Sequence, residues 1–238
     1  MKNLFHYFLN FLDSNLQQKN LDIIKKHLKN NIDVYVDVGA HNGEMIEIIS
    51  NEFVVNKILA IEPNPDCYLK LKKIKYFKKL LIFNLALSDK KGFDFLKIGH
   101  ISTMSTINDL NDKSVYTKFK KIIMSIFYFS NQIYKRKIKI KKDLLSNILK
   151  LSKIKKIDLL KIDTEGHEFN VLKGAKNFLK NTHLVLFEFH YDDSIIKKYS
   201  YNDVNNFLQK KNFKLISKNK MILRKGYELI YKNNNFLK

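Results

Sequence analysis

Val34-Tyr35-Val36-Asp37-Val38 begins the stretch that decides the fold; Gly39-Ala40-His41-Asn42-Gly43 and Glu44-Met45-Ile46-Glu47-Ile48-Ile49 complete it. The β-branched and aromatic run predicts a buried strand, the two glycines predict a tight turn, and the last segment predicts a helix. In an open α/β sheet a ligand binds beyond the carboxyl ends of the strands, where glycines let the backbone approach it closely. This stretch therefore predicts a ligand site at residues 39–43.

A second predicted strand, Ile58–Ile61, ends at Glu62. An acidic side chain at this place in such a fold can accept both hydroxyls of a ribose. Pro63 and Pro65 are the only prolines in the chain. They stiffen the turn that presents Glu62 and start the next helix, with Asn64 as its cap. The glycine turn and Glu62 together predict a nucleoside clamp.

The charge at the turn indicates which nucleoside cofactor binds there. A dinucleotide site has Gly-x-Gly-x-x-Gly against a pyrophosphate, whereas this turn has Gly39 and Gly43 only, with Asp37 two residues earlier. A carboxylate repels pyrophosphate and attracts an ammonium group. S-adenosylmethionine has an ammonium and a sulfonium and no phosphate, so this methyl donor is favoured over NAD. The alternative is an ordinary strand–helix turn with a solvated Asp37.

The composition fits one α/β domain, because 238 residues with 45% hydrophobic content can bury a single sizeable core. The single cysteine, Cys67, excludes an intramolecular disulfide and favours a reducing, cytoplasmic location. The net charge is +21, but 42 of the 44 basic residues are lysines. Nucleic-acid recognition more often uses arginine forks as well. We therefore expect much of the charge to reflect coding bias and a nucleic-acid partner to be unlikely, with an acidic substrate or a membrane surface as the open alternatives.

We expect four segments in a single domain: N-terminal helices (1–31), a cofactor half (32–90), an insertion that acts as a substrate lid (91–142) and a catalytic and closing half (143–238). No apolar run is long enough to cross a membrane. The apolar stretch 4–12 predicts a packed helix, with peripheral contact at the inner face of a membrane as the alternative.

The middle of the chain predicts a third strand at 81–87, with Ser88 and Asp89 at its tip near the adenine. The insertion predicts an accessory strand at 92–98 and an edge strand at 137–141 whose lysines point outward. Between these strands lie a hydroxyl-rich loop at 102–106 and an apolar segment at 122–134.

The second half predicts a helix at 143–151 and a buried strand at 157–162 that delivers Asp163-Thr164-Glu165-Gly166-His167-Glu168 at its carboxyl end. A further strand at 184–187 runs into Glu188 and His190, which alternation places on one side. One helix (202–211) and two strands (213–216 and 227–231, joined by a loop with Gly226) close the chain.

These residues resemble the FkbM family of S-adenosylmethionine-dependent methyltransferases. The matching segments are Asp37–Gly43, Glu62–Pro65, Ala86–Asp89, Ile157–Glu168, Lys173–Ala175 and Glu188. The resemblance implies a class I methyltransferase fold: a Rossmann-like three-layer α/β sandwich whose seven-stranded sheet is mostly parallel, with an antiparallel strand near one edge. It also implies O-methylation of a sugar, a polysaccharide or another small-molecule hydroxyl, with S-adenosylhomocysteine as product.

The resemblance also implies roles for single residues. Asp37, Gly39 and Gly43 would hold the methionine end, Glu62 the ribose and Asp89 the adenine, and Asp163, Glu165, Gly166 and His167 would form the floor where donor and acceptor meet. The complete cofactor set is Asp37, Gly39, Ala40, His41, Asn42, Gly43, Glu62, Pro63, Ala86, Leu87, Ser88, Asp89, Asp163 and Glu165. The chain departs from the family where a Leu-Asp pair is expected, because Lys142-Asp143 stands there, and segment 107–134 has no counterpart.

Methyl transfer to a hydroxyl needs a base within hydrogen-bond reach, and histidine can serve near neutral pH. Our hypothesis makes His167 that base, with Asp163 and Glu188 orienting donor or acceptor. His190 is the second choice and His100 the third.

Three alternatives stay open. A divalent metal on Asp163, Glu188 and His190 is possible but not favoured. A nucleic-acid methyltransferase would use the lysine surface, although the Pro-Pro-aromatic loop of amino-methylating DNA enzymes is missing after the strand at 157–162. A non-catalytic binding protein would keep the fold without binding the donor.

Overall fold

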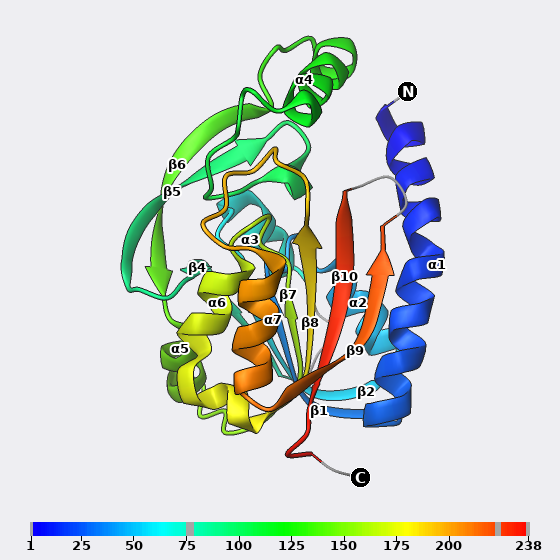
Figure 1. Ribbon diagram of the computed structural model, residues 1–238, viewed down its shortest axis with the longest axis vertical. Helices are drawn as coiled ribbons and strands as arrows, with labels where there is room; N and C mark the ends of the chain where they lie inside the picture. The colour runs from blue at the N-terminus through cyan, green and yellow to red at the C-terminus, as the bar shows by residue number, and fades with distance from the viewer. Residues whose placement is uncertain (1, 75–78, 222–224, 237–238) are drawn as a thin grey trace.

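The computed structural model describes residues 2–74, 79–221 and 225–236, and for residues 2–14 it describes the backbone alone. Its centre is a seven-stranded sheet of order β3-β2-β1-β7-β8-β10-β9 (Figure 1). The strands are β1 Asn31–Val38, β2 Val54–Ile61, β3 Leu80–Phe83, β7 Ile157–Ile162, β8 Thr182–His190, β9 Phe213–Lys220 and β10 Gly226–Asn233. Only β10 runs against its neighbours, since it pairs antiparallel with β8 and β9. The predicted mostly parallel sheet is confirmed.

Helices cover both faces of this sheet and complete three layers. Their bounds are α1 Lys2–Leu28, α2 Glu44–Glu52, α3 Pro65–Leu71, α5 Leu145–Leu151, α6 Glu168–Ala175 and α7 Tyr201–Lys210. Ile24, Ile46 and Leu71 from α1, α2 and α3 share one apolar cluster with Tyr35 of β1. The second cluster joins α5, α6 and α7 to the opposite face, where Val36 lies. Because both faces of the central strands are buried, these strands read as nearly continuous apolar runs.

The insertion forms a separate three-stranded sheet of order β4-β6-β5, made of β4 Ala86–Leu87, β5 Gly92–Gly99 and β6 Tyr134–Asp143. The prediction of one strand over residues 81–87 is therefore wrong, because this segment is divided between two sheets. The side-chain amide of Asn84 marks the break, donating to the backbone carbonyls of Glu62 (2.9 Å) and Pro63 (3.2 Å).

Several predicted boundaries also differ. The helix expected from residue 143 begins at Leu145, and Asp143 instead ends β6. Gly226 is the first residue of β10 and not part of a loop. The apolar segment 122–134 is divided, since residues 122–128 end a helix, α4 Val115–Tyr128, and Tyr134 begins β6. A single helix, α1, occupies the N-terminal segment where more than one was expected. The apolar side chains at 4–12 lie outside the described part of that helix.

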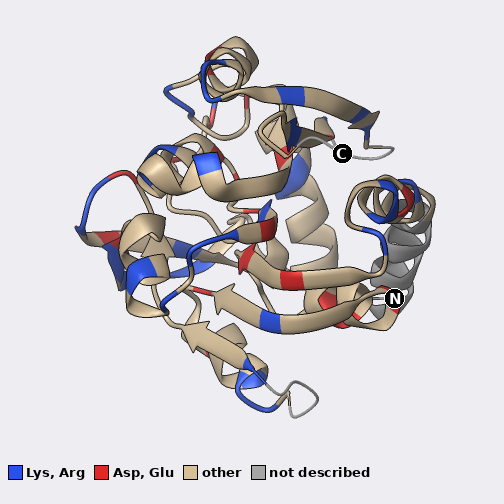
Figure 2. Cartoon of the chain, turned by 90° about the horizontal axis from the view of Figure 1, so that it is seen from below, with Lys and Arg blue, Asp and Glu red and all other residues tan. Residues whose placement is uncertain are grey.

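Lys and Arg are spread over helices, strands and loops (Figure 2). Within the described ranges, no helix combines the length and the apolarity that crossing a membrane requires.

Candidate functional site

A cavity of about 700 Å³ opens at the carboxyl ends of β1, β2, β7 and β8. The glycine turn lines it together with Glu62 and Pro63, with Asp163–Glu165, and with Ser102, Thr103 and Ser105–Ile107 of the insertion. Gln17 and Asn20 of α1 and Glu228 of β10 also reach it. Elements far apart in the sequence therefore meet at the edge where the sequence places the ligand.

The glycine turn lies directly against the end of β7. Gly39 has φ +79°, and a Cβ built on it would lie 1.8 Å from the backbone oxygen of Asp163. The backbone N–H groups of Gly39 and Ala40 both donate to the carbonyl of Ile61, at 2.9 and 3.1 Å. Only glycine fits at residue 39, because both the conformation and the contact exclude a side chain.

The Glu62 carboxylate is buried beside this turn. It accepts the backbone N–H groups of His41 (2.8 Å) and Asn64 (2.7 Å). Burial raises the pKa of Glu62 to about 7. The predicted helix start is confirmed, because the Asn64 side chain accepts the N–H of Asp66 and Pro65 is the first residue of α3.

Lys161 lies between two carboxylates below the glycine turn. Its ammonium is 3.3 Å from Asp37 and 3.4 Å from Asp163. Burial opposes its charge, but Asp37 and Asp163 together hold the pKa of Lys161 above its ordinary value. Asp37 is fully buried and does not line the cavity, whereas Asp163 and Lys161 do.

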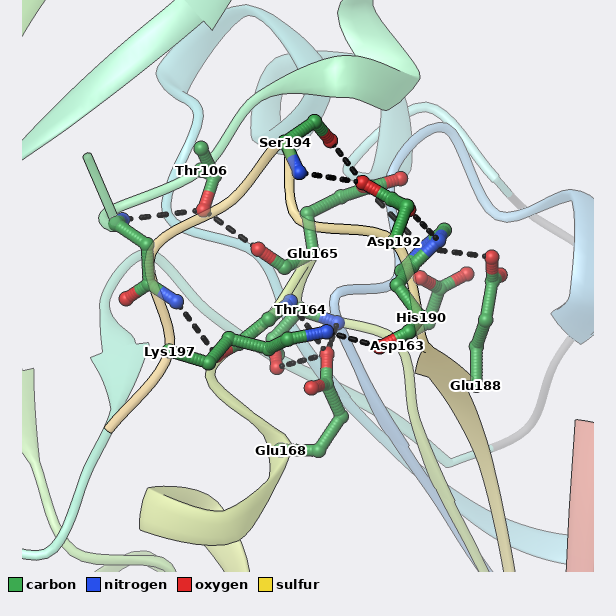
Figure 3. A network of polar contacts seen from close by, with 12 residues as sticks. Thr106, Asp163, Thr164, Glu165, Glu168, Glu188, His190, Asp192, Ser194 and Lys197 are labelled. Atoms are coloured by element: carbon green, nitrogen blue, oxygen red, sulfur yellow. Dashed lines mark hydrogen bonds and ion pairs between the residues drawn. The ribbon is translucent and has the colours of Figure 1, made fainter. Parts of the chain in front are cut away.

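The loop after β7 is shaped by the buried carboxylate of Glu168 (Figure 3). One of its oxygens accepts three hydrogen bonds, from the N–H and hydroxyl of Thr164 and the N–H of Gly166, at 2.9–3.1 Å. The other accepts the hydroxyl of Tyr199 at 2.6 Å. Glu165 and Gly166 both have positive φ, so the loop reverses tightly and needs these bonds.

Three carboxylates surround His190 (Figure 3). Its Nε2 is 2.8 Å from Glu188 and 3.5 Å from Glu165, and its Nδ1 is 3.6 Å from Asp192. Burial disfavours the charge, but Glu188 and its neighbours hold the pKa of His190 well above its ordinary value. His190 is therefore protonated near neutral pH, and this argues against its use as the base.

Asp163, Glu188 and His190 were the alternative metal ligands. Among the described residues, no three His, Cys, Asp or Glu side chains are grouped so as to hold a metal ion. His190 pairs instead with carboxylates, as described above.

His167 lines the cavity and is mostly buried. Its Nε2 is 3.0 Å from the Ser88 hydroxyl and its Nδ1 is 3.4 Å from the side-chain oxygen Oδ1 of Asn108. Burial lowers the pKa of His167, so the ring is neutral near pH 7. His100 packs against Tyr128, with ring centroids 5.6 Å apart, and is not among the cavity residues.

The insertion closes over the glycine turn and the β7 loop. The Ser102 hydroxyl is 2.7 Å from Nε2 of His41, and the Thr106 hydroxyl donates to the carbonyl of Glu165 at 2.7 Å. The hydroxyl-rich loop predicted from the sequence therefore lies at the cavity.

Most predicted site residues line this cavity. They are Gly39, Ala40, His41, Asn42, Glu62, Pro63, Ala86, Leu87, Asp163, Glu165, His167 and Glu188. The predicted residues outside the lining are Asp37, Gly43, Ser88, Asp89, Gly166 and His190. Asp89 pairs with Lys173 at 3.1 Å.

Sequence reasoning missed Lys161, Glu228 and Asn20. Lys161 is a polar residue among the apolar residues Leu159, Leu160 and Ile162. Its position on a buried strand, near the acidic ends of two strands, was the only feature of the sequence that indicated a role in the site. Glu228 lies opposite Glu188 in the β8–β10 ladder, and the amide of Asn20 donates to it. Burial, followed by the charge of Glu188, raises the pKa of Glu228 to about 7.

The cavity is acidic although the protein is basic. Its lining contains six acidic residues, one lysine and two histidines, whereas the whole chain has a net charge of +21. Burial opposes the charge of His41, but its hydrogen bonds to Cys67 and Glu44 raise its pKa to about 10, so this histidine is a second cation in the lining. The acidic residues are Glu44, Glu62, Asp163, Glu165, Glu188 and Glu228.

Comparisons with known proteins agree with this architecture. Residues 37–215 match the family model described as the methyltransferase FkbM domain. Among solved structures, the chain is similar to the methyltransferase FkbM from Methylobacillus flagellatus KT, with 12% identity and a TM-score of 0.52. That match covers 84% of this chain and 43% of the other, so the chain spans less than half of that relative's length.

Two further solved structures are similar at lower scores. M. capricolum TrmK, in complex with S-adenosyl-homocysteine, has 11% identity and a TM-score of 0.49, covering 90% of this chain and 68% of its own. Magnesium protoporphyrin IX methyltransferase (ChlM) from Synechocystis PCC 6803, with bound SAM, has 7% identity and a TM-score of 0.48, covering 94% and 85%. No curated protein matches the chain by sequence.

Proposed function

Because the chain belongs to the FkbM methyltransferase domain family, we propose that it transfers a methyl group from S-adenosylmethionine to a hydroxyl of a sugar, a polysaccharide or another small molecule. The observation that carries this proposal is the acidic cavity in a basic protein. Carboxylates attract a cationic sulfonium donor and repel a pyrophosphate. S-adenosylhomocysteine is then the product.

The cavity residues fit this donor. In this proposal Glu62 accepts the ribose hydroxyls, the backbone of residues 39–42 holds the methionine end, and Pro63, Ala86 and Leu87 contact the adenine, and all of these residues line the cavity. Asp163 and Glu165 face its charged groups. Asp37 acts through Lys161, while Gly43, Ser88 and Asp89 support the lining from outside. When bound, the cofactor supplies an electrophilic methyl group.

We assign the base to His167. It lines the cavity and is neutral, whereas three carboxylates outweigh burial and leave His190 protonated. This role requires the tautomer with the proton on Nδ1, directed at the Asn108 side-chain oxygen, which leaves the lone pair on Nε2. An acceptor hydroxyl that replaces Ser88 at Nε2 gives its proton to His167. Asp163 and Glu188 orient the reacting groups.

The acceptor side of the cavity suits a polyhydroxylated molecule. Ser102, Thr103 and Ser105 contribute hydroxyls, and Glu165 and Glu188 contribute carboxylates that accept hydrogen bonds. A sugar presents many hydroxyls that such groups can bind. Segment 91–142 then acts as a substrate lid in a single domain, and the protein works in polysaccharide biosynthesis in the cytoplasm.

Calorimetry with S-adenosylhomocysteine, with NADH as the comparison ligand, tests the donor. We expect binding of the first compound only, and a Glu62→Gln variant should weaken it at least about tenfold, since an amide cannot accept both ribose hydroxyls. Glu47→Gln, on the exposed face of α2, is the matched control. Binding of NADH alone, or of neither compound, contradicts the proposal.

Incubation with methyl-labelled donor tests the acceptor. The panel contains nucleotide sugars, oligosaccharides and transfer RNA. Label in a sugar fraction supports the proposal, whereas label in RNA or in none of the fractions contradicts it.

A further inference from the structure

Helix α4 carries an apolar face that the body of the protein does not cover. Val115, Phe119, Ile122 and Ile126 follow each other at intervals of four, three and four residues, so they share one side of the helix. Their exposed fractions are 80, 54, 56 and 62%. Phe129, directly after the helix, is 93% exposed. Exposed apolar residues usually occur singly, and a continuous stripe marks an interaction surface.

The opposite side of α4 packs against the rest of the protein. Thr117 and Met124 are buried, and Met124 shares an apolar cluster with Ile101 and Ile133. The Ser114 side chain caps the helix by accepting the N–H groups of Tyr116 and Thr117. The exposed stripe is therefore displayed by a helix that is anchored through its other face.

The surroundings of the stripe are strongly cationic. Residues 113–142 contain ten Lys and Arg and no Asp or Glu. Lys113 and Lys118 are exposed beside the stripe, and Lys137, Lys139 and Lys141 are exposed on β6. Such a combination of an apolar face and lysines is typical of a helix that lies on an anionic membrane.

The small sheet also carries exposed aromatic rings, toward the end of β5 that lies away from Tyr134. Phe93 and Phe95 of β5 are 66 and 47% exposed. The ammonium groups of Lys139 and Lys137 lie 4.9 and 4.5 Å from their ring centroids. Phenylalanine and lysine side chains are thus exposed together, as expected at a membrane surface, where an apolar layer lies next to a charged one.

We propose that α4 docks this protein on an anionic lipid surface, with the stripe in the acyl region and the lysines against the headgroups. The helix has 14 residues, about 21 Å, so it lies in the plane of the membrane and does not span it. A second copy of the chain fits less well, because two surfaces with exposed lysines beside the stripe would repel each other. A nucleic acid would engage the lysines but offers nothing for the aliphatic side chains.

This docking has a consequence for the cavity. Figure 1 shows α4 and the N-terminal end of α1 at the end of the molecule toward which β8 points. The cavity lies at the carboxyl ends of the same strands, and residues of the insertion line it. A membrane bound to α4 therefore lies on the side of the cavity, where a lipid-carried acceptor would be within reach.

Vesicle co-sedimentation of the full chain tests the proposal without any cofactor, so its outcome is independent of methyl transfer. We expect binding to phosphatidylcholine vesicles that contain phosphatidylglycerol and little binding to phosphatidylcholine alone. Ile122→Glu combined with Ile126→Glu should weaken binding at least about tenfold, because it puts two charges into the apolar layer. Leu151→Glu is the matched control, since Leu151 is 70% exposed on α5.

Thermal unfolding checks that all variants remain folded. Equal binding to both vesicle types overturns the proposal, and so does full binding by the α4 variant. A wild-type dimer that the α4 variant converts to a monomer, with vesicle binding unchanged, assigns the stripe to contacts between copies instead. Loss of transfer-RNA binding without loss of vesicle binding assigns it to nucleic acid.

Discussion

The ammonium of Lys161 lies 3.3 Å from the carboxylate of Asp37, and Asp37 is fully buried. The two residues occupy paired positions of β1 and β7. Asp37 therefore does not face the cavity with a free charge. It holds Lys161, which in turn contacts Asp163 at the cavity floor. The acidic character of the cavity comes from Asp163 and the glutamates around it.

Replacement of Lys161 by methionine should cost about 3–5 kcal/mol of unfolding free energy, because it leaves the Asp37 charge buried without a partner. Denaturant unfolding measures this. Asp37→Asn in the same chain should restore most of the loss, because it removes the uncompensated charge. The matched control is Lys156→Met, which removes an ion pair to Asp158 from a half-exposed lysine and should cost less than about 1 kcal/mol. Equal losses in the two lysine variants would contradict this account.

Gly39→Ala should abolish S-adenosylhomocysteine binding in calorimetry. The new Cβ would lie 1.8 Å from the Asp163 carbonyl at φ +79°, so the turn and the β7 tip must separate. Gly92→Ala is the comparison, because Gly92 also has positive φ, +149°, but no atom within 4 Å of the added Cβ. The Gly92→Ala variant therefore tests the effect of a side chain at positive φ without a steric clash, and it should leave the ligand affinity unchanged. An alanine at residue 39 that still binds the ligand would show that the close approach is dispensable.

Glu228 should make the protein less stable as the pH rises from about 5 to 8. Its pKa is raised from 4.5 to about 7 in the folded state, mainly by burial. The folded state therefore holds a proton that the unfolded state releases near pH 4.5, and this stabilisation is complete below that pH and is lost as the pH rises through about 7. Denaturant unfolding at pH 5 and pH 8 should show Glu228→Gln reducing the loss by an amount on the order of 3 kcal/mol. Glu47→Gln, exposed on α2, should follow the wild type.

The sequence predicted the core of the fold well because its signals are local. The β-branched run before Gly39, the prolines after Glu62 and the polar loop after Ile162 each mark the end of a strand. In a parallel sheet these ends meet at one edge. The position of the cavity at this edge could therefore be predicted from the sequence, although most of the residues from other segments that line it could not.

The missed features depend on contacts between distant segments. Residues 81–87 read as one strand because the pattern is apolar throughout, yet Asn84 turns toward the carbonyls of Glu62 and Pro63 and divides it. Glu228 belongs to the site because it lies opposite Glu188 on the neighbouring strand, and Lys161 because it forms an ion pair with Asp37. No local pattern encodes such partners.

His167→Ala should lower the rate of methyl transfer to the acceptor found by labelling about 10²–10⁴-fold, the usual contribution of a positioned base. S-adenosylhomocysteine affinity, measured by calorimetry, should stay within about threefold, because the ring serves the acceptor. Burial lowers the pKa of His167, so the wild-type rate should be constant at neutral pH and fall only below the ordinary imidazole range, as the ring gains a proton. Asn108→Ala should have a smaller effect on the rate, since it leaves the imidazole in place and removes the side chain that contacts Nδ1 and donates to the Gly166 carbonyl. If the alanine variant keeps the wild-type rate, or if its rate falls at low pH as the wild-type rate does, His167 is not the base. Solvent would then accept the proton.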